Sequence, residues 1–189
     1  MATIVGICGS LRSGSFNMML LRAVAASAPQ GTIEIASIRD IPLYDGDLEA
    51  SAGIPEAVQR LKDAIAKADG LLIVTPEYNN SMPGVLKNTI DWLSRPPADI
   101  ERVFRGRPVA IIGATPGQGG TRLSQAAWLP VIRTLGMLPC FESLIMISGA
   151  AKIFDASGAI VDEATRDRVR RFTEGFARFA AAHAPNGRT

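Results

Sequence analysis

The sequence predicts an α/β fold in which a parallel β-sheet is covered by helices on both faces. Short apolar runs alternate along the chain with segments whose apolar residues recur at helical spacing. Most of these runs are apolar at nearly every position rather than at every second one. Strands of that kind are typical of parallel sheets that are buried on both faces.

Five segments are expected to form strands. Residues 70–76 and 108–115 are apolar almost throughout, and residues 3–9 are rich in β-branched side chains. Residues 32–38 alternate between apolar and polar side chains, which indicates a half-exposed strand. Residues 140–148 supply the fifth strand.

Helical patterns fill the intervals between these strands. The expected helices begin at Phe16, cover residues 54–68, 85–94 and 122–136, and end with one that begins near Asp162. Pro130 is expected to bend the fourth of them. Residues 41–53 are expected to form a turn-rich connection.

Strand and helix thus alternate five times, which fits a flavodoxin-like three-layer sandwich with a five-stranded sheet in the order 2-1-3-4-5. No repeat or internal boundary interrupts the pattern, so residues 1–189 are expected to form a single domain. In such sheets ligands bind beyond the carboxyl ends of the strands. The loops that follow the first, third and fourth strands are therefore the expected site.

Composition excludes several classes of function. The net charge is +2, and the one basic cluster, residues 166–171, is expected to be a solvated helix face, so nucleic acid is not an expected partner. The chain has one histidine, His183, and two cysteines, Cys8 and Cys140, without metal-ligand spacing. Neither a histidine triad nor a metal site is expected. No signal peptide or membrane-spanning run is seen, and the cytoplasm is the expected location.

The first loop, GSLRSGSFN at residues 9–17, is rich in hydrogen-bond donors and has no acidic residue. It precedes a helix N-terminus, where free backbone N–H groups favour an anion. The guanidinium of Arg12, the amide of Asn17 and the serine hydroxyls suit a phosphate. The loop matches neither nucleotide-binding glycine motif, and its spacing suits a phosphate monoester such as that of FMN. The alternative is a capped turn with Ser15 as N-cap and Arg12 solvated.

The second loop, TPEYNNSMPG at residues 75–84, has the side chains that a flavin ring needs. Pro76 stiffens its start and Tyr78 offers a flat apolar face, with hydrogen-bonding asparagine and serine beside them. Glu77 either accepts from a ring N–H or faces water. The alternative for the whole loop is an ordinary turn, in which Asn and Pro serve backbone geometry.

The third loop, ATPGQGG at residues 114–120, is rich in glycine, which lets the backbone approach a flat ligand closely. Its alternative is a flexible turn. Arg122 lies just beyond it. This side chain could assist an anionic substrate, a pyridine-nucleotide phosphate or a subunit contact, or be a plain surface arginine.

Together the three loops resemble those of the NAD(P)H-dependent FMN reductase family, and the bacterial quinone reductases also called chromate reductases are the most similar. The motifs that carry the resemblance are GSLRSGSFN, TPEYNNSMPGVLKNTIDWLSRP, GATPGQGG and, after the second strand, DIPLYDGD. The resemblance spans nearly the whole chain. It implies non-covalently bound FMN and electron transfer from NADH or NADPH to quinones, flavins, azo compounds or metal oxyanions such as chromate.

The resemblance also assigns side chains to the cofactor. It implies that the phosphate and ribityl chain contact Ser10, Arg12, Ser15, Phe16 and Asn17. It implies that the isoalloxazine ring contacts Pro76, Glu77, Tyr78, Asn79, Ser81, Thr115, Pro116, Gly117, Gly119 and Gly120. Arg95 and Arg122 are candidates for contact with substrate. Members of this family are usually dimers or tetramers, with the site near a subunit interface.

The expected mechanism is ping-pong hydride transfer, in which the flavin carries the chemistry and no side chain is assigned as a catalytic acid or base. The alternative is a flavodoxin-type electron carrier without NAD(P)H activity of its own. Such carriers are strongly acidic and bury the flavin between aromatic side chains. This chain is near neutral, and Tyr78 is the only aromatic residue in its ring-side loops. A phosphate-receiver domain is excluded because no acidic residue follows the first strand.

Overall fold

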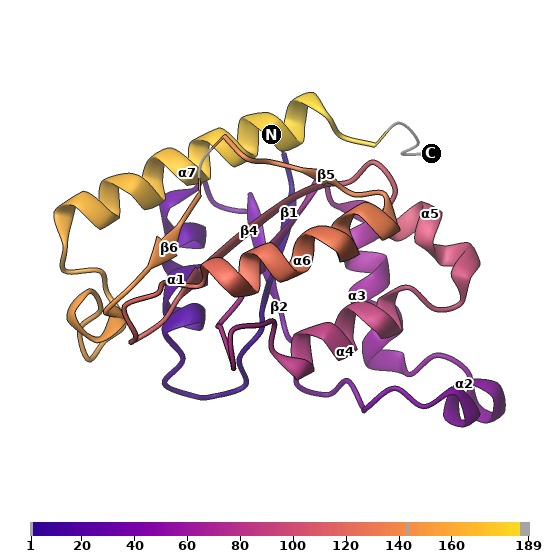
Figure 1. Cartoon of the computed structure of the whole chain (residues 1–189). Coiled ribbons are helices and arrows are strands. Elements are labelled where there is room, and N and C mark those ends of the chain that lie inside the picture. The colour runs from indigo at the N-terminus through magenta and orange to yellow at the C-terminus, as the bar shows by residue number, and fades with distance from the viewer. Residues whose placement is uncertain (1, 143, 186–189) are drawn as a thin grey trace.

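The computed structural model describes residues 2–142 and 144–185. Its sheet has the strand order β2-β1-β3-β4-β5, all pairs are parallel, and a short sixth strand, β6, also pairs with β4 (Figure 1). The predicted sheet order is confirmed. The strands are β1 Ile4–Cys8, β2 Ile33–Ala36, β3 Gly70–Val74, β4 Pro108–Ala114, β5 Leu138–Pro139 and β6 Met146–Ile147.

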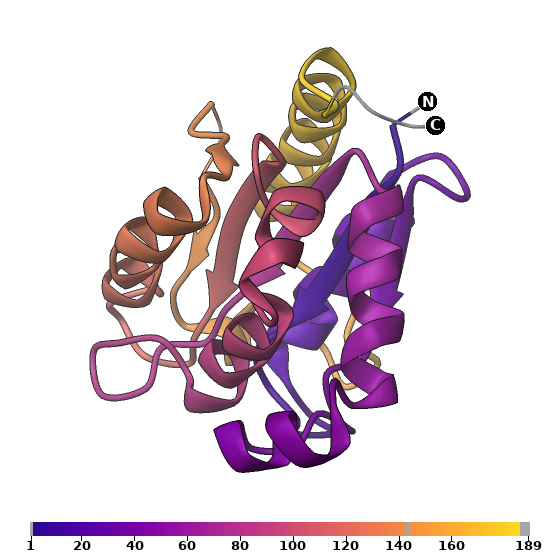
Figure 2. The same ribbon diagram turned by 90° about the vertical axis from the view of Figure 1, so that its right-hand side faces the viewer.

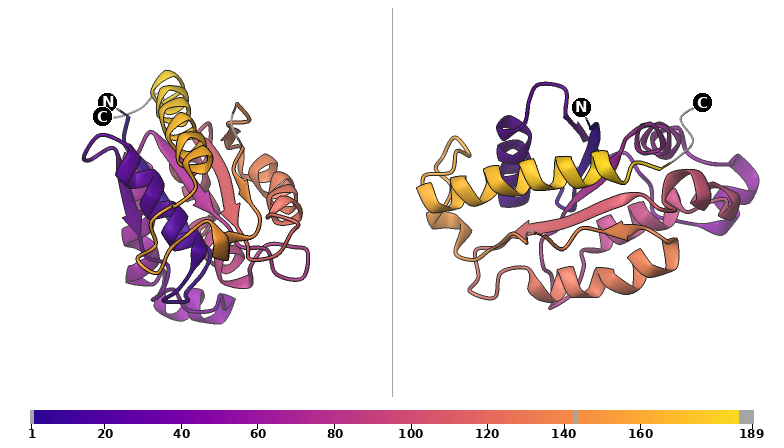
Figure 3. Two further views of the ribbon diagram at one scale, coloured as in Figure 1. Left: turned by 90° about the vertical axis from the view of Figure 1, so that its left-hand side faces the viewer. Right: turned by 90° about the horizontal axis from the view of Figure 1, so that it is seen from above.

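Helices cover both faces of the sheet. In the right-hand view of Figure 3, α1 and α7 lie on one side of the strands and α6 lies on the other. The α-helices are α1 Phe16–Ser27, α2 Gly46–Ala52, α3 Glu56–Lys67, α4 Gly84–Leu93, α5 Ile100–Val103, α6 Arg122–Leu135 and α7 Glu163–Ala182, with 3₁₀ turns at Pro97–Asp99 and Ala150–Lys152. Pro130 lies inside α6, and the bend expected there stays a prediction.

Two apolar cores hold the layers together. Leu21 and Phe172 belong to the core between the sheet and the helices α1 and α7. Ile65, Trp92 and Trp128 belong to the core under α3, α4 and α6. Every residue of β1, β3 and β4 is buried, because these central strands have a core on each face.

The predicted fifth strand, residues 140–148, is wrong as a continuous element. β5 ends at Pro139 before that segment begins, and only Met146–Ile147 within it forms a strand. Val109 pairs with Pro139, and Gly113 pairs with Met146. An advance of four residues along β4 thus corresponds to an advance of seven residues from β5 to β6. The three extra residues cannot stay in register, and the chain leaves the ladder between the two strands. Ser143, which belongs to the prediction, lies outside the described residues.

The connection over residues 41–53 contains a helix, α2, that the sequence did not predict. Asp45 caps it, since its carboxylate accepts a hydrogen bond from the Asp47 N–H at 2.9 Å. No residue of α2 is buried, so it carries no apolar stripe that could have signalled a helix. Figure 2 shows α2 in violet at the lower edge of the molecule.

A buried lysine holds the segment between α4 and β4. The Lys62 side chain is 0% exposed on α3, and its Nζ donates to the carbonyl of Arg95 and pairs with the carboxylate of Asp99. Arg102 also binds Asp99, Nε to Oδ1, at 3.0 Å. The Arg102 guanidinium, with help from Lys62, holds the pKa of Asp99 below its ordinary value despite partial burial of that carboxyl.

Replacement of Asp99 by asparagine tests this cluster. Asp99→Asn leaves Lys62 buried without its carboxylate and is expected to lower the free energy of unfolding by about 3 kcal/mol at pH 7. Asp99 binds its proton less readily in the folded state, so its contribution is complete above the ordinary aspartate pKa of about 4 and is lost as pH falls through the lower folded-state pKa. Urea denaturation from pH 7 to pH 3 should show the variant and the wild type converging.

Asp91→Asn is the matched control, because Asp91 pairs with Lys87 on an exposed face of α4 at 2.7 Å. This variant is expected to cost less than about 1 kcal/mol at any pH. Equal losses in the two variants would contradict the role given to the buried pair.

Candidate functional site

The three predicted loops start from neighbouring strands at one edge of the sheet. Cys8 pairs with Val74, and Val74 pairs with Ile112, so β1, β3 and β4 end side by side. The Gly9 N–H donates to the carbonyl of Val74 at 2.8 Å and extends this pairing into the first loop. The tertiary structure therefore brings the three loops together at the carboxyl edge, where ligands of such sheets bind.

In the first loop, Ser15 has the capping role that was one of its two predicted roles. Its Oγ accepts from the Met18 N–H at 3.3 Å, at the N-terminus of α1. Ser10 is buried beside it, whereas Arg12 is exposed and makes no hydrogen bond or ion pair with the described residues. The N-terminus of α1 and an uncommitted guanidinium thus border one loop without acidic residues.

Asn17 joins the first loop to the fourth strand. Its Nδ2 donates to the carbonyl of Ala114 at 2.8 Å, and its Oδ1 accepts from the Ala114 N–H at 2.9 Å. The side chain is buried. Its amide therefore bridges α1 and the end of β4, and contact with a cofactor phosphate stays a prediction. The Phe16 ring likewise turns toward the core, where its centroid lies 6.0 Å from that of Phe154.

The second loop contains a tight turn that presents Tyr78. Tyr78 and Ser81 exchange backbone hydrogen bonds of 3.1 and 3.0 Å. Asn79 and Asn80 between them have φ of +50° and +60°, as a type I′ turn requires, and asparagine tolerates this region better than most residues. The Tyr78 side chain is left 48% exposed at the turn, while Pro76 before it is buried.

The Glu77 carboxylate does not simply face water, because it is hydrogen-bonded within the protein. Its Oε2 accepts from the Leu123 N–H at 2.8 Å and from the Ser124 N–H at 3.0 Å. These groups belong to the first turn of α6, whose own N-cap residue, Thr121, makes no side-chain cap. A carboxylate there also suits the positive end of the helix dipole. Glu77 thus supplies the cap from a different loop, which neither predicted role anticipated.

A second contact, close to Glu77 in the sequence, joins the second loop to α6. The Thr75 and Ser124 hydroxyl groups lie 2.9 Å apart, and the Trp128 Nε1 donates to the Thr75 Oγ1 at 3.4 Å. All three side chains are buried. The second loop and the helix after the third loop therefore form one hydrogen-bonded unit.

The third loop is exposed at residues 116–119, two of which are glycines. The Gly117 N–H donates to the Thr115 Oγ1 at 3.3 Å, and Gly120 has φ of +63°, a value that favours glycine. A Cβ added at Gly119 would meet nothing within 4 Å. Open space therefore lies over the backbone at Gly119.

The two arginines proposed for substrate contact do not join the three loops. Arg95 follows the far end of α4, about 15 Å along the helix from the second loop, and its Nε pairs with Glu49 of α2 at 2.9 Å. Arg122 borders a cavity of about 190 Å³ between α6 and the β5–β6 segment, together with Leu129 and Phe141. Both assignments stay predictions, and this placement favours the subunit-contact alternative for Arg122.

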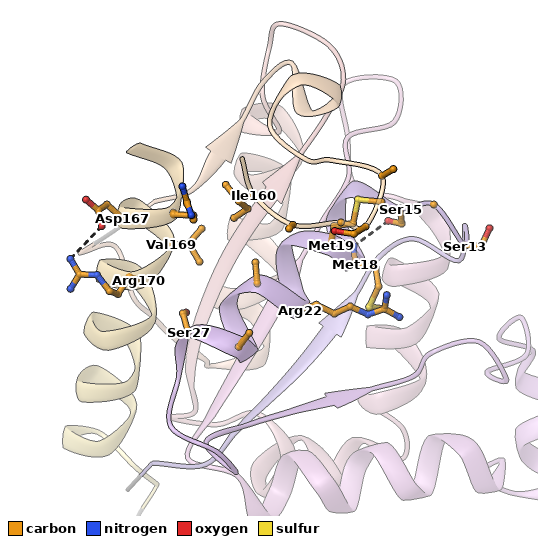
Figure 4. A pocket seen from close by; sticks show the side chains of 18 residues that line it. Ser13, Ser15, Met18, Met19, Arg22, Ser27, Ile160, Asp167, Val169 and Arg170 are labelled. Carbon is orange, nitrogen blue, oxygen red and sulfur yellow. Dashed lines mark hydrogen bonds and ion pairs between the residues drawn. The ribbon is translucent and has the colours of Figure 1, made fainter. Parts of the chain in front are cut away.

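Neither Cys8 nor the cavity between α1 and α7 supplies chemistry to this edge. Burial raises the pKa of the Cys8 thiol, which makes it a poor nucleophile at neutral pH. A cavity of about 960 Å³ lies between α1, α7 and residues 156–160 (Figure 4). It meets the first loop at residues 13–15 but contains no residue of the second or third loop. The cavity therefore lies away from the ring-side loops.

The residues at the carboxyl edge fit a phosphate-bearing flat cofactor. The first loop combines an N-terminus, serine hydroxyls and Arg12 without a carboxylate, which matches a phosphate. Exposed Tyr78 and the open backbone at Gly119 offer flat contact on the ring side. No exposed acid–base pair accompanies them among the described residues of the three loops.

Comparison with known proteins agrees with this geometry. The family model described as NADPH-dependent FMN reductase matches residues 2–152, which is most of the chain. The chain belongs to the NADPH-dependent FMN reductase family. Members of this flavoenzyme family use FMN with NAD(P)H as electron donor, so the predicted family, enzyme class and cofactors are confirmed.

Relatives within and near the FMN reductase family align over almost their whole length. An NAD(P)H-dependent FMN reductase of Pseudomonas aeruginosa is 45% identical, with 89% of each chain covered. A 2-hydroxy-1,4-benzoquinone reductase of a Burkholderia species is 41% identical, over 92% of this chain and 93% of the relative. The solved structure of FerB, an NAD(P)H:(acceptor) oxidoreductase of Paracoccus denitrificans, superposes with a TM-score of 0.86 at 35% identity, over 98% and 100% of the two chains.

Sequence reasoning missed the groups that hold this FMN reductase site together. The Asn17–Ala114 and Glu77–α6 contacts join residues that are 97 and 46 or more positions apart. No local pattern reveals such pairs. The sequence did not signal the missing cap at the start of α6, because Thr121 is itself a preferred N-cap residue and only the structure shows that its side chain makes no cap.

Removal of the Glu77 carboxylate tests the cap. Glu77→Ala leaves two N–H groups of α6 without an acceptor and is expected to lower the free energy of unfolding by about 1–2 kcal/mol, the cost of a lost N-cap. Glu77→Gln keeps an acceptor oxygen and is expected to retain more than half of that stability. Denaturant unfolding measures both. Equal stability of the alanine variant and the wild type would contradict the capping role.

Proposed function

We propose that this protein is an FMN-dependent reductase that transfers electrons from NAD(P)H to quinones in a ping-pong reaction. One observation carries the proposal: a donor-rich loop without acidic residues lies at the same sheet edge as an exposed aromatic turn and an open glycine loop. The first feature suits a phosphate and the other two suit a flat ring with room above it. Fold and family agree with this assignment.

Two groups of residues are proposed to hold the FMN. Arg12, Ser10 and the N-terminus of α1 capped by Ser15 would bind the phosphate, with Phe16 and Asn17 next to the ribityl chain. The ring would lie against Pro76, Glu77, Tyr78, Asn79 and Ser81 on one side and Thr115, Pro116, Gly117, Gly119 and Gly120 on the other. Within this set, buried Asn17 and half-buried Glu77 join the loops to β4 and α6 through their hydrogen bonds.

The protein's own task in the reaction is positioning. When bound, FMN accepts a hydride from the nicotinamide of NAD(P)H and passes two electrons to an acceptor. The hydrogen bonds of Asn17 and Glu77 hold the three loops together. A flat donor and then a flat acceptor can therefore stack at one place beside the second and third loops. The backbone of the glycine loop is proposed to border the ring, where open space over Gly119 leaves room for a flat ligand.

Quinones are the favoured acceptors because relatives that match nearly the full chain are named for them. These include the 2-hydroxy-1,4-benzoquinone reductase and an Escherichia coli quinone reductase that is 37% identical over 93% of this chain. Free flavins, azo compounds and chromate belong to the wider proposal, since an open stacking site discriminates weakly between flat or small acceptors. Steady-state kinetics over an acceptor panel would rank them.

Self-association and location complete the proposal. Leu129 and Phe141 are exposed by 44% and 60% beside the cavity that Arg122 borders, which supports burial of this face in a dimer or tetramer. Light scattering of the purified protein tests that state. Among the helices of residues 2–142 and 144–185, none combines the length and apolar character needed to cross a bilayer. A cytoplasmic location, with no membrane or nucleic-acid partner, is proposed.

Purification and anaerobic titration test the assignment as an enzyme. The protein is expected to be yellow and to be bleached by NADPH or NADH without a partner protein, and quinone should restore the colour. Colourless protein that cannot be reconstituted with FMN would contradict the flavoprotein assignment. Yellow protein that only a partner reductase can reduce would favour the flavodoxin-type carrier instead.

Replacement of Arg12 tests the phosphate site. Arg12→Ala removes a charge-assisted hydrogen bond and is expected to weaken FMN binding by roughly 1.5–3 kcal/mol, about a tenfold to hundredfold rise in Kd. Fluorescence quenching of FMN by apoprotein measures this affinity. Arg60→Ala, on the exposed face of α3, is the matched control and should leave it unchanged. An unaltered FMN affinity in the Arg12 variant would refute the assignment.

A further inference from the structure

Another cavity opens at the carboxyl edge, on the β2 side of the first loop. Its volume is about 430 Å³, and we name it the arginine cavity. It is lined by Cys8, Ser10, Leu11, Arg12, Ser13, Met18, Arg22, Ile35, Ala36, Ser37, Ile38 and Arg39. The lining thus comes from the first loop, from α1 and from the chain around the end of β2.

The charge of the arginine cavity is of one sign. Three arginines, Arg12, Arg22 and Arg39, line it, and no acidic residue does. Within the described residues, the guanidinium groups of Arg12 and Arg22 make no hydrogen bond or ion pair. Arg12 is proposed above for the FMN phosphate, which leaves Arg22 and Arg39 for a second anion. Two guanidinium groups with unused donors at a small cavity suit an oxyanion of more than one charge, such as a phosphate monoester.

The structure orients the side chains of Arg39 and Arg22. The Arg39 Nη2 donates to the carbonyl of Leu11 at 2.6 Å, which holds this side chain against the first loop. Figure 4 shows Arg22 extending from α1 beneath Met18, toward the side on which Ser13 lies. The ion pair of Arg170 with Asp167, at 3.5 Å, lies on the opposite side in that view. Arg22 is therefore directed away from Asp167, the one acidic residue that lines the cavity of about 960 Å³ between α1 and α7.

The arginine cavity lies at a suitable distance from the ring-side loops. β2 is the edge strand, and β1, β3 and β4 follow it in order. With about 4.8 Å between neighbouring strands, the end of β2 lies roughly 10–15 Å across the sheet from the ends of β3 and β4. A dinucleotide whose nicotinamide meets the flavin at the ring-side loops can extend its adenosine end over that span.

We propose that the arginine cavity binds the 2′-phosphate of NADPH and so makes NADPH the preferred donor. This inference rests on the proposed function. In dinucleotide-binding α/β sheets, an arginine near the end of the second strand accommodates a 2′-phosphate, and Arg39 lies three residues beyond β2. Arg22 comes from α1 and Arg39 follows β2, and neither is among the groups proposed for the FMN phosphate, although Ser10 and Arg12 of that set line the same cavity.

The test compares donors in the FMN-loaded enzyme and binding of fragments to it. The wild type is expected to have a higher kcat/KM for NADPH than for NADH and to bind 2′,5′-ADP more tightly than 5′-ADP by calorimetry. Arg39→Ala and Arg22→Ala are each expected to lower the NADPH-to-NADH ratio of kcat/KM by about tenfold. Each should also weaken 2′,5′-ADP binding by a similar factor. Arg60→Ala is the control and should change neither quantity.

The possible failures are distinguishable. Unchanged donor ratios and unchanged 2′,5′-ADP affinity in both arginine variants would overturn the proposal. A loss of FMN affinity in these two variants, with the donor ratio unchanged, would also overturn it and assign the cavity to the FMN phosphate. Tight 2′,5′-ADP binding that depends on Arg39, in a protein that neither nucleotide reduces, would support the anion site while rejecting the proposed reductase function.

Discussion

The paired hydrogen bonds between the Asn17 amide and the Ala114 backbone are the constraint on which the carboxyl edge depends. They bind the start of α1 to the end of β4, across the position of β3 in the sheet. Because the side chain is buried, water does not compete for these groups, and loss of either partner would leave a buried polar atom unsatisfied. The first and third loops consequently leave the sheet with a set separation.

Glu77 and Thr75 complete the same framework from the second loop. Both bind α6, one through backbone N–H groups at its first turn and one through the Ser124 hydroxyl. Close packing supports this, since a Cβ at Gly113 would lie 2.2 Å from the carbonyl of Thr75. These hydrogen-bonded polar groups thus serve the scaffold, whereas Arg12, Tyr78, Gly117 and Gly119 are exposed and Gly120 is buried. That division suits an enzyme whose cofactor supplies the reactive atoms.

Charge is also divided across the molecule. The arginines around the first loop lie among hydroxyl and apolar groups, whereas Lys62 and Arg102 are bound by the carboxylates of Asp99 and Asp63 between α3 and the α4–β4 connection. Arg95 is likewise bound by Glu49. Neutralised pairs stabilise the fold locally, whereas the guanidinium groups around the first loop have no carboxylate among the residues that line their cavity. The net charge of +2 does not reveal this separation of paired and unpaired cationic groups.

The sequence by itself determined the layered α/β fold, the strand order and the three loops, because apolar runs, helical periodicity and loop composition are local properties of the chain. Only the tertiary structure decided that α2 forms without an apolar stripe, that the fifth strand breaks where three residues lose register, and that Glu77 caps α6. It also assembled Arg12, Arg22 and Arg39 around one cavity. These outcomes depend on groups distant along the chain, whose meeting is set by packing of the layers rather than by any local pattern.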